Sequence, residues 1–151
     1  MKLLDHINHE HKDLRPQIEQ LKTAADMVGT ATADELPDAL NQSYSFLTQH
    51  LTPHAKSEEE VLYALVAKYS GTSAAVDIMT RDHEEVAALT AQLGDMINNG
   101  ADDNALRDTL YTLHSLISLH FNKEEQFMLP VLEAHLTAED DEHAAHHLHS
   151  H

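Results

Sequence analysis

The stretch that decides the fold runs from residue 106 to residue 131 and reads LRDTLYTLHSLISLHFNKEEQFMLPV. Its inward positions recur at alternating steps of three and four residues, which is the spacing of one face of an α-helix. These positions are Leu106, Leu110, Leu113, Ile117, His120, Glu124, Phe127 or Met128, and Val131. His120 and Glu124 interrupt the apolar row without leaving its phase. The stretch therefore predicts a long helix whose buried face carries two ionisable side chains.

Three further segments, over residues 4–28, 36–65 and 76–97, repeat this spacing. Turn signals rich in Gly, Ser, Thr and Asn separate the segments at residues 29–32, 70–73 and 98–101. A period of about 3.5 residues with short connections is typical of helices that pack nearly antiparallel. The sequence therefore predicts an all-α fold, an antiparallel up-down-up-down four-helix bundle over residues 1–136. Pro16, Pro53 and Pro130 fall inside predicted helices, where we expect kinks.

Composition excludes several classes of protein. The chain has 151 residues, which is the size of one domain, and its 9 Lys and Arg against 26 Asp and Glu give a net charge of −17. Nucleic acid and anionic membrane surfaces need clustered basic residues, so neither is an expected partner. No apolar run approaches the roughly 18 residues of a spanning helix, and the amino terminus does not resemble a signal peptide. The cytoplasm is the expected location.

The chain has no Cys and 14 His. The absence of Cys removes disulfides, thiolate catalysis and Cys-ligated metal centres. Any metal must therefore be bound by His and carboxylate side chains. Five of the His lie in the last nine residues, within a polar segment over residues 137–151 that we predict to be a disordered acidic and His-rich tail with incidental affinity for metal ions.

Six ionisable residues share the inward phase of the four predicted helices. They are His11, His54, Glu58, His83, His120 and Glu124. A single His on an apolar face is usually a hydrogen-bonded core residue, and a bundle whose His residues only hydrogen-bond is the structural alternative. Six such residues would each need a separate partner, because unpaired buried charges destabilise a fold by several kcal/mol. The set therefore favours a metal site.

The spacing of these residues indicates an internal duplication. His54 and Glu58, like His120 and Glu124, stand four residues apart and so lie about one helical turn apart on the same face. A lone His precedes each pair, His11 in the first half and His83 in the second. A two-fold arrangement of His, His and Glu is what a two-metal centre needs, with the glutamates in position to bridge.

The order H, HxxxE, H, HxxxE on four successive helices resembles the hemerythrin-like proteins, the HHE cation-binding domain family, over roughly the first 135 residues. The resemblance implies a four-helix bundle that holds two non-haem iron ions, bridged by an oxo or hydroxo group when oxidised. It also implies dioxygen, peroxide or nitric oxide as the small-molecule partner. The ligands it implies are His11, His54, Glu58, His83, His120 and Glu124.

The chain departs from the oxygen-carrying hemerythrins on the third helix, where they have two His residues four apart. Here Met79 and Ala87 flank His83. We expect the iron beside His83 to have an open coordination position or to take another ligand, for which His50 is the candidate. A His50 that is exposed, or that only hydrogen-bonds to a glutamate, is an equally favoured alternative. Tyr44 and Tyr111 could approach the site as phenols, although core packing is the favoured role for both.

The donor set favours iron over zinc, because structural zinc prefers closed tetrahedral sites. Several His with two potentially bridging carboxylates suit metal ions of higher coordination number, with iron as the first candidate and manganese as the second. Two functions remain open. The first is peroxide removal, catalase- or peroxidase-like, in oxidative-stress defence. The second is a non-catalytic sensor or carrier of dioxygen, nitric oxide or iron. Both use the same ligands, so the sequence leaves open whether the chain is an enzyme.

Overall fold

The structure is a computed structural model and describes residues 1–30, 32 and 34–149. Within this part of the chain the regular elements are all helical, which confirms the predicted all-α class. The elements are α1 (Lys2–Met27), α2 (Glu35–Phe46), η1 (Leu47–Leu51), α3 (Thr52–Glu60), α4 (Leu62–Ser70), α5 (Ala74–Asn99), α6 (Asp103–Lys123), η2 (Glu124–Met128), α7 (Leu129–His135) and α8 (Ala138–His149). None of these helices is long and apolar enough to cross a membrane.

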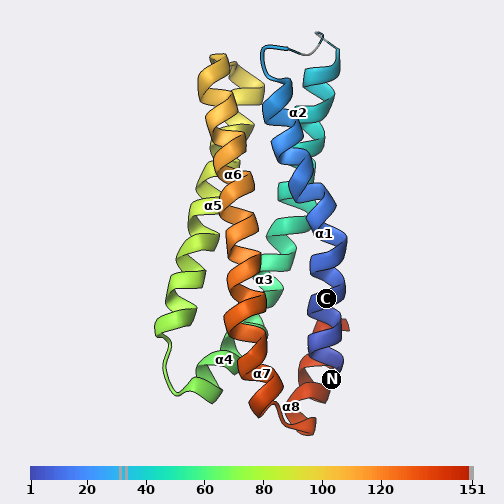
Figure 1. Cartoon of the computed structure of the whole chain (residues 1–151), viewed down its shortest axis with the longest axis vertical. Helices are drawn as coiled ribbons and strands as arrows, with labels where there is room; N and C mark the ends of the chain where they lie inside the picture. The colour runs from blue at the N-terminus through green and yellow to red at the C-terminus, as the bar shows by residue number, and fades with distance from the viewer. Residues whose placement is uncertain (31, 33, 150–151) are drawn as a thin grey trace.

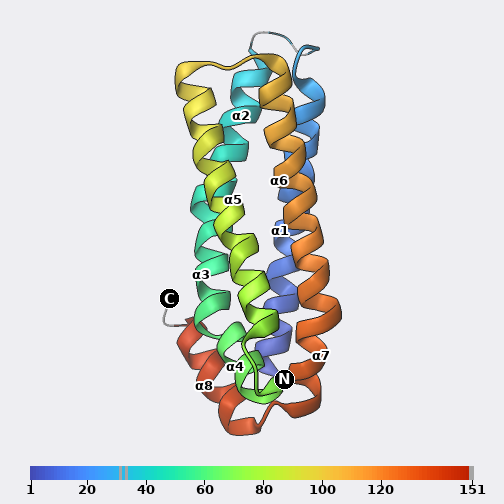
Figure 2. The ribbon, with the colours of Figure 1, turned by 90° about the vertical axis from the view of Figure 1, so that its left-hand side faces the viewer.

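Four helical runs lie side by side along the long axis of the molecule, and the chain reverses direction between successive runs (Figure 1). The first run is α1, the second is α2 through α4, the third is α5, and the fourth is α6 through α7. Helix α1 packs against α2 and α6, and α5 packs against the same two helices, so the runs form a closed ring. The last helix, α8, is not part of these runs; it folds back at the end of the molecule that holds the N-terminus (Figure 2).

The apolar core has two parts. The larger cluster lies toward the end of the bundle where α1 connects to α2, and it includes Leu21, Leu47 and Leu113. The smaller cluster lies toward the opposite end, where the chain starts, and it includes Leu62 and Leu132. On α1, His11 falls between Ile7 of the smaller cluster and Leu14 of the larger one, so a polar layer separates the two.

Two short π-helical segments interrupt the second and fourth runs. Segment η1 ends just before α3, and Pro53 is the second residue of α3; segment η2 ends just before α7, and Pro130 is the second residue of α7. Both prolines therefore stand in the first turn of a helical segment, where the missing N–H is tolerated. Single π turns are frequent at functional sites, and these two flank the residues of the polar layer. Pro16 remains inside α1.

The structure differs from the predicted disordered tail, because residues 138–149 form helix α8, which packs against α1. Ala144 and Ala145 are buried, and Asp140, Asp141 and Glu142 pair with the rest of the chain. Asp140 accepts from the Lys68 ammonium at 2.8 Å, and Glu142 accepts from the Lys2 ammonium at 2.6 Å. Small apolar residues on one face and acids opposite Lys residues thus hold the helix in place. The end of the predicted tail, residues 150–151, lies outside the described residues, as does Ala31 in the first predicted turn.

Candidate metal centre

The polar layer brings together the six side chains that the sequence singles out. They come from all four runs, with His11 on α1, His54 and Glu58 on α3, His83 on α5, His120 on α6 and Glu124 on η2. Among the described residues, ligand atoms lie within 4.8 Å of one another in two overlapping groups. The first is His11, His54, Glu58 and Glu124, and the second is Glu58, His83, His120 and Glu124. Both glutamates belong to both groups, as two bridging carboxylates would.

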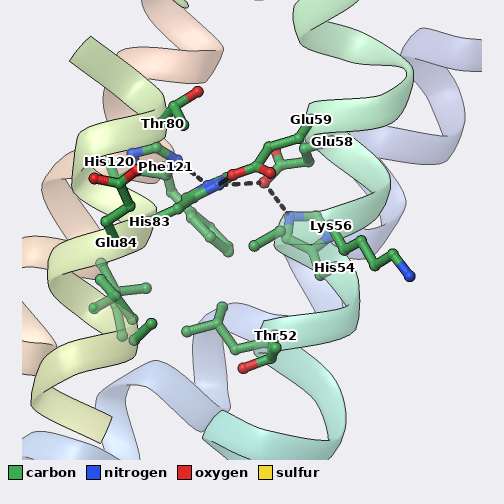
Figure 3. Close-up of a pocket in the computed structure, with 15 residues that line it drawn as sticks. Thr52, His54, Lys56, Glu58, Glu59, Thr80, His83, Glu84, His120 and Phe121 are labelled. Atoms are coloured by element: carbon green, nitrogen blue, oxygen red, sulfur yellow. Dashed lines mark hydrogen bonds and ion pairs between the residues drawn. The ribbon is translucent and has the colours of Figure 1, made fainter. Parts of the chain in front are cut away.

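The Nε2 atoms of the four His rings face the two carboxylates. On α3, His54 Nε2 lies 3.1 Å from Glu58 Oε1. His11 Nε2 lies 3.6 Å from Glu58 Oε2 and 3.4 Å from Glu124 Oε1, so it faces both acids. From the other half, His83 Nε2 lies 3.7 Å from Glu58 Oε1, and His120 Nε2 lies 3.5 Å from Glu124 Oε2. Figure 3 shows His54 and Glu58 of α3 pointing toward His83 of α5.

Several of these atoms are buried without a hydrogen-bond partner. They are His11 Nε2, His54 Nε2, both carboxylate oxygens of Glu58, and Glu124 Oε1. Leaving a buried polar group unsatisfied destabilises a fold by about 1–3 kcal/mol, and by more for charged groups. A bound cation would satisfy all of these lone pairs at once. Imidazole nitrogens mixed with carboxylate oxygens suit iron or manganese, so the residues present fit a metal centre.

The two glutamates have opposite pKa shifts. Burial and the neighbouring charge of Glu124 raise the pKa of Glu58 well above its usual range. Burial acts in the same direction on Glu124, but the neighbouring Glu58, His11 and His120 side chains lower its pKa well below the usual value. Burial would lower the pKa of His11, yet the nearby carboxylates of Glu124 and Glu58 raise it to about 9. Without metal the layer therefore holds protons, which a cation must displace.

Each of the four His rings has an outer carboxylate at its Nδ1 atom. Asp82 accepts from His120 at 3.1 Å, and Glu59 accepts from His83 at 2.9 Å. His11 faces Glu125 at 3.4 Å. The remaining ring, that of His54, pairs with Glu10. A proton donated from Nδ1 leaves Nε2 free to bind a metal, and such partners fix the orientation of the ring.

Each outer carboxylate contacts a His on a different element from its own. The acid just before each lone His contacts the His of an HxxxE pair on another helix: Glu10 pairs with His54, and Asp82 accepts from His120. The acid just after each inward Glu contacts a lone His: Glu59 accepts from His83, and Glu125 faces His11. Two of the four acids also bind cations, because Arg15 pairs with Glu125 and Lys123 lies 3.2 Å from Asp82.

Tyr63 is a site residue that the sequence reasoning missed. This side chain on α4 is 2% exposed, and its hydroxyl donates to Glu124 Oε2 at 2.9 Å. The hydroxyl oxygen of Tyr63 also lies 2.9 Å from His120 Nε2 and 3.1 Å from His83 Nε2. Burial and the charges of Glu124 and Glu58 raise the pKa of Tyr63, so its phenol stays protonated in the metal-free chain. At the corresponding place five residues after Glu124 stands Leu129, whose side chain cannot donate a hydrogen bond.

Helix phase explains why Tyr63 was missed. A position five residues after Glu58 faces away from the site in a continuous α-helix. Here α3 ends at Glu60 and α4 begins at Leu62, and Val61 between them has φ −115° and ψ −63°. This break changes the phase of the second run and turns Tyr63 inward. The signal in the sequence was a Tyr only five residues after Glu58 of an HxxxE pair.

The structure does not bring His50, Tyr44 or Tyr111 to the site. His50 is exposed on η1 and belongs to neither group of ligands. Tyr44 is 37% exposed and packs against Gly94, where an added Cβ would come within 2.9 Å of the Tyr44 ring. The Tyr111 hydroxyl donates to Asp26. Tyr111 is half-buried against the larger core cluster, as the sequence favoured, whereas Tyr44 is exposed and the predicted core packing was wrong for it.

A cavity of about 310 Å³ opens from the solvent onto the centre between α3 and α5 (Figure 3). His54, Glu58, His83 and His120 lie along its inner side. Ala87, one of the two residues that flank His83 where oxygen-carrying hemerythrins have a second His, is part of the cavity wall. Met79, the other, is buried in the smaller core cluster. The site is therefore reachable by a small molecule from one side.

Comparison with known proteins supports the resemblance drawn from the sequence. The family model described as "Hemerythrin HHE cation binding domain" matches residues 2–132. The chain is also similar to the iron–sulfur cluster repair protein YtfE of Cronobacter sakazakii, with 30% identity over 102 residues, 64% of this chain and 46% of that protein. The chain thus spans about half the length of this curated relative. No solved structure matches the chain.

Proposed function

The chain belongs to the hemerythrin HHE cation-binding domain family, and we propose that it holds two non-haem iron ions and removes peroxide. In this proposal His11 and His54 would hold the first ion and His83 and His120 the second, and Glu58 and Glu124, which belong to both groups, would contribute to both. The orphaned buried nitrogen and oxygen atoms of this set carry the proposal. We further propose that the four helical runs are the up-down-up-down bundle of the family, with α8 added. His50 is left out because it is exposed.

Bound iron would supply the electrons that cleave an O–O bond, and the protein would supply the rest. Disproportionation of hydrogen peroxide converts two molecules into one dioxygen and two water molecules, so protons must move between the two halves of the cycle. Tyr63 is placed for this, because its hydroxyl faces the second group of ligands and stays protonated. Phe121 stacks on His11 with ring centroids 4.1 Å apart and keeps bulk water from that ring.

The relative in Cronobacter favours a second candidate, a nitrosative-stress or iron-handling module that binds nitric oxide or iron without turnover. That protein is named for iron–sulfur cluster repair, and the matched part of the present chain covers only 46% of it. The two candidates share every ligand. They differ in whether the cavity admits a substrate that is consumed or a ligand that stays bound.

The deciding experiment loads the full chain with ferrous iron without oxygen, removes loose metal, and measures iron per chain and gas release on addition of hydrogen peroxide. The variant His54→Ala/His120→Ala separates the proposed centre from adventitious binding by the His of α8. We expect two irons in the wild-type chain, sustained dioxygen release, and loss of both in the variant. A single stoichiometric spectral change would support the binding module. Equal iron in both proteins would refute the ligand assignment.

A further inference from the structure

The cavity beside the metal centre is larger than a peroxide needs. A water molecule takes up about 30 Å³ in the liquid, and hydrogen peroxide adds one oxygen atom to that. The cavity measures about 310 Å³, which falls at the lower end of the range for small-molecule sites, about 300–1,000 Å³. It can therefore hold an organic molecule of about ten heavy atoms, with one end at the ligands of the centre.

The walls of the cavity are apolar and its inner side is polar. Leu51, Ala55, Val86, Ala87, Ile117 and Phe121 form the walls. The polar part of the lining includes His54, Glu58 and His120, which are buried, and His83, which is half-buried. A molecule with a hydrocarbon body and one small oxygen-rich end matches this division, because burying the body is favourable by about 25 cal/mol per Å².

The charges around the opening disfavour an anion. Glu59 and Glu84 lie at the cavity, both exposed, and the whole chain has a net charge of −17. The one Lys of the lining, Lys56, extends away from the space between the helices in Figure 3. A carboxylate or phosphate group would therefore meet repulsion on entry and find no Lys or Arg side chain inside the cavity.

We propose that this cavity binds a neutral organic hydroperoxide, with its hydrocarbon group against the apolar wall and its O–O group at the His and Glu side chains. The inference rests on the proposed function, because it names the substrate class of the same site. Ala87 is a small residue of the cavity lining on α5, one turn after His83, and a Phe at this position tests whether the cavity is the binding site.

Cumyl alcohol, the neutral alcohol that corresponds to cumene hydroperoxide, tests binding without being consumed. Its dissociation constant is measured calorimetrically with the iron-loaded full chain, and with the variants Ala87→Phe and Ala88→Phe. Ala88 is the matched control, because it is exposed on the same helix and outside the cavity lining. We expect Ala87→Phe to weaken binding about tenfold or more and Ala88→Phe to leave it unchanged. With the metal-free full chain, in which no iron can bind a carboxylate, an anion of similar size, 2-methyl-2-phenylpropanoate, should bind at least about tenfold more weakly than the alcohol.

Three results would overturn the inference: no binding of cumyl alcohol to the wild-type chain, binding that Ala87→Phe does not weaken, or an anion that binds as tightly as the alcohol. Circular dichroism of both variants shows whether each retains its helical fold. Iron per chain, measured on the same samples, separates this result from the proposed function. If the chain binds two irons but no cumyl alcohol, only the inference about the cavity is refuted. If the chain binds the alcohol but no iron, the proposed function is refuted.

Discussion

Asp82 Oδ2 lies 3.1 Å from the Nδ1 atom of His120, although Asp82 adjoins a different ligand, His83, in the sequence. The acid on α5 thus orients a ring on α6. The same exchange joins α1 to α3, where Glu10, next to His11, pairs with His54. Because each ring pairs with a carboxylate from another helix, the candidate metal centre is correctly formed only when the helices are correctly packed.

Replacement of Asp82 by Asn should weaken ferrous iron binding by about 10- to 100-fold, because the amide cannot fix the His120 ring as the carboxylate does. Competition with a coloured chelator measures the change. The control is Glu85→Gln, an exposed acid on the same helix, which we expect to leave the affinity unchanged. An Asp82→Asn chain with wild-type affinity would show that the contact does not position His120.

Removal of the Tyr63 hydroxyl should separate metal binding from turnover. If this group transfers protons, Tyr63→Phe should keep two irons per chain and lose about 10²-fold or more in the rate of dioxygen release from hydrogen peroxide. Tyr111→Phe removes a hydroxyl that bonds only to Asp26 among the described residues, and it serves as the control. Full activity in Tyr63→Phe would remove the proton-transfer role.

Two His residues four positions apart should behave differently. His54→Ala removes a buried ligand and should lose about one iron per chain, because a four-ligand group loses one of its nitrogen donors. His50→Ala removes an exposed ring and should retain both ions. Elemental analysis after anaerobic loading provides the comparison. Iron lost from His50→Ala as well would mean that η1 rearranges when metal binds.

The stability of the metal-free chain should fall as pH rises. The pKa of His11 is about 9 in the folded chain against 6.5 for an ordinary His. Its contribution to the free energy of unfolding is therefore fully present below pH 6.5 and is lost as pH rises through about 9. The shift corresponds to about 3 kcal/mol. Urea unfolding of the metal-free chain at several pH values measures the loss, and His11→Gln should flatten the curve. Stability that rises across this interval would contradict the protonated state.

The inward residues could be predicted from the sequence because each helix presents its face with one period. His11, His83 and His120 keep the phase of the apolar residues around them, so spacing alone finds them. The outer carboxylates could not be found this way, because their partners lie on other helices. Tyr63 was hidden by the break at Val61, which changes the phase within one run. Helix α8 was missed because its composition is polar, while its partners Lys2 and Lys68 are far away in the sequence.

The polar layer between the two apolar clusters also bears on how the chain unfolds. Without a cation, the layer between the larger cluster around Leu47 and Leu113 and the smaller one around Leu62 and Leu132 contains buried polar atoms that lack hydrogen-bond partners. Ligands from all four helical runs would tie the clusters together once metal binds, so metal supplies cooperativity as well as chemistry. Loss of metal would then release the end that holds α4, α7 and α8 as a separate unit of local unfolding, leaving the opposite end folded.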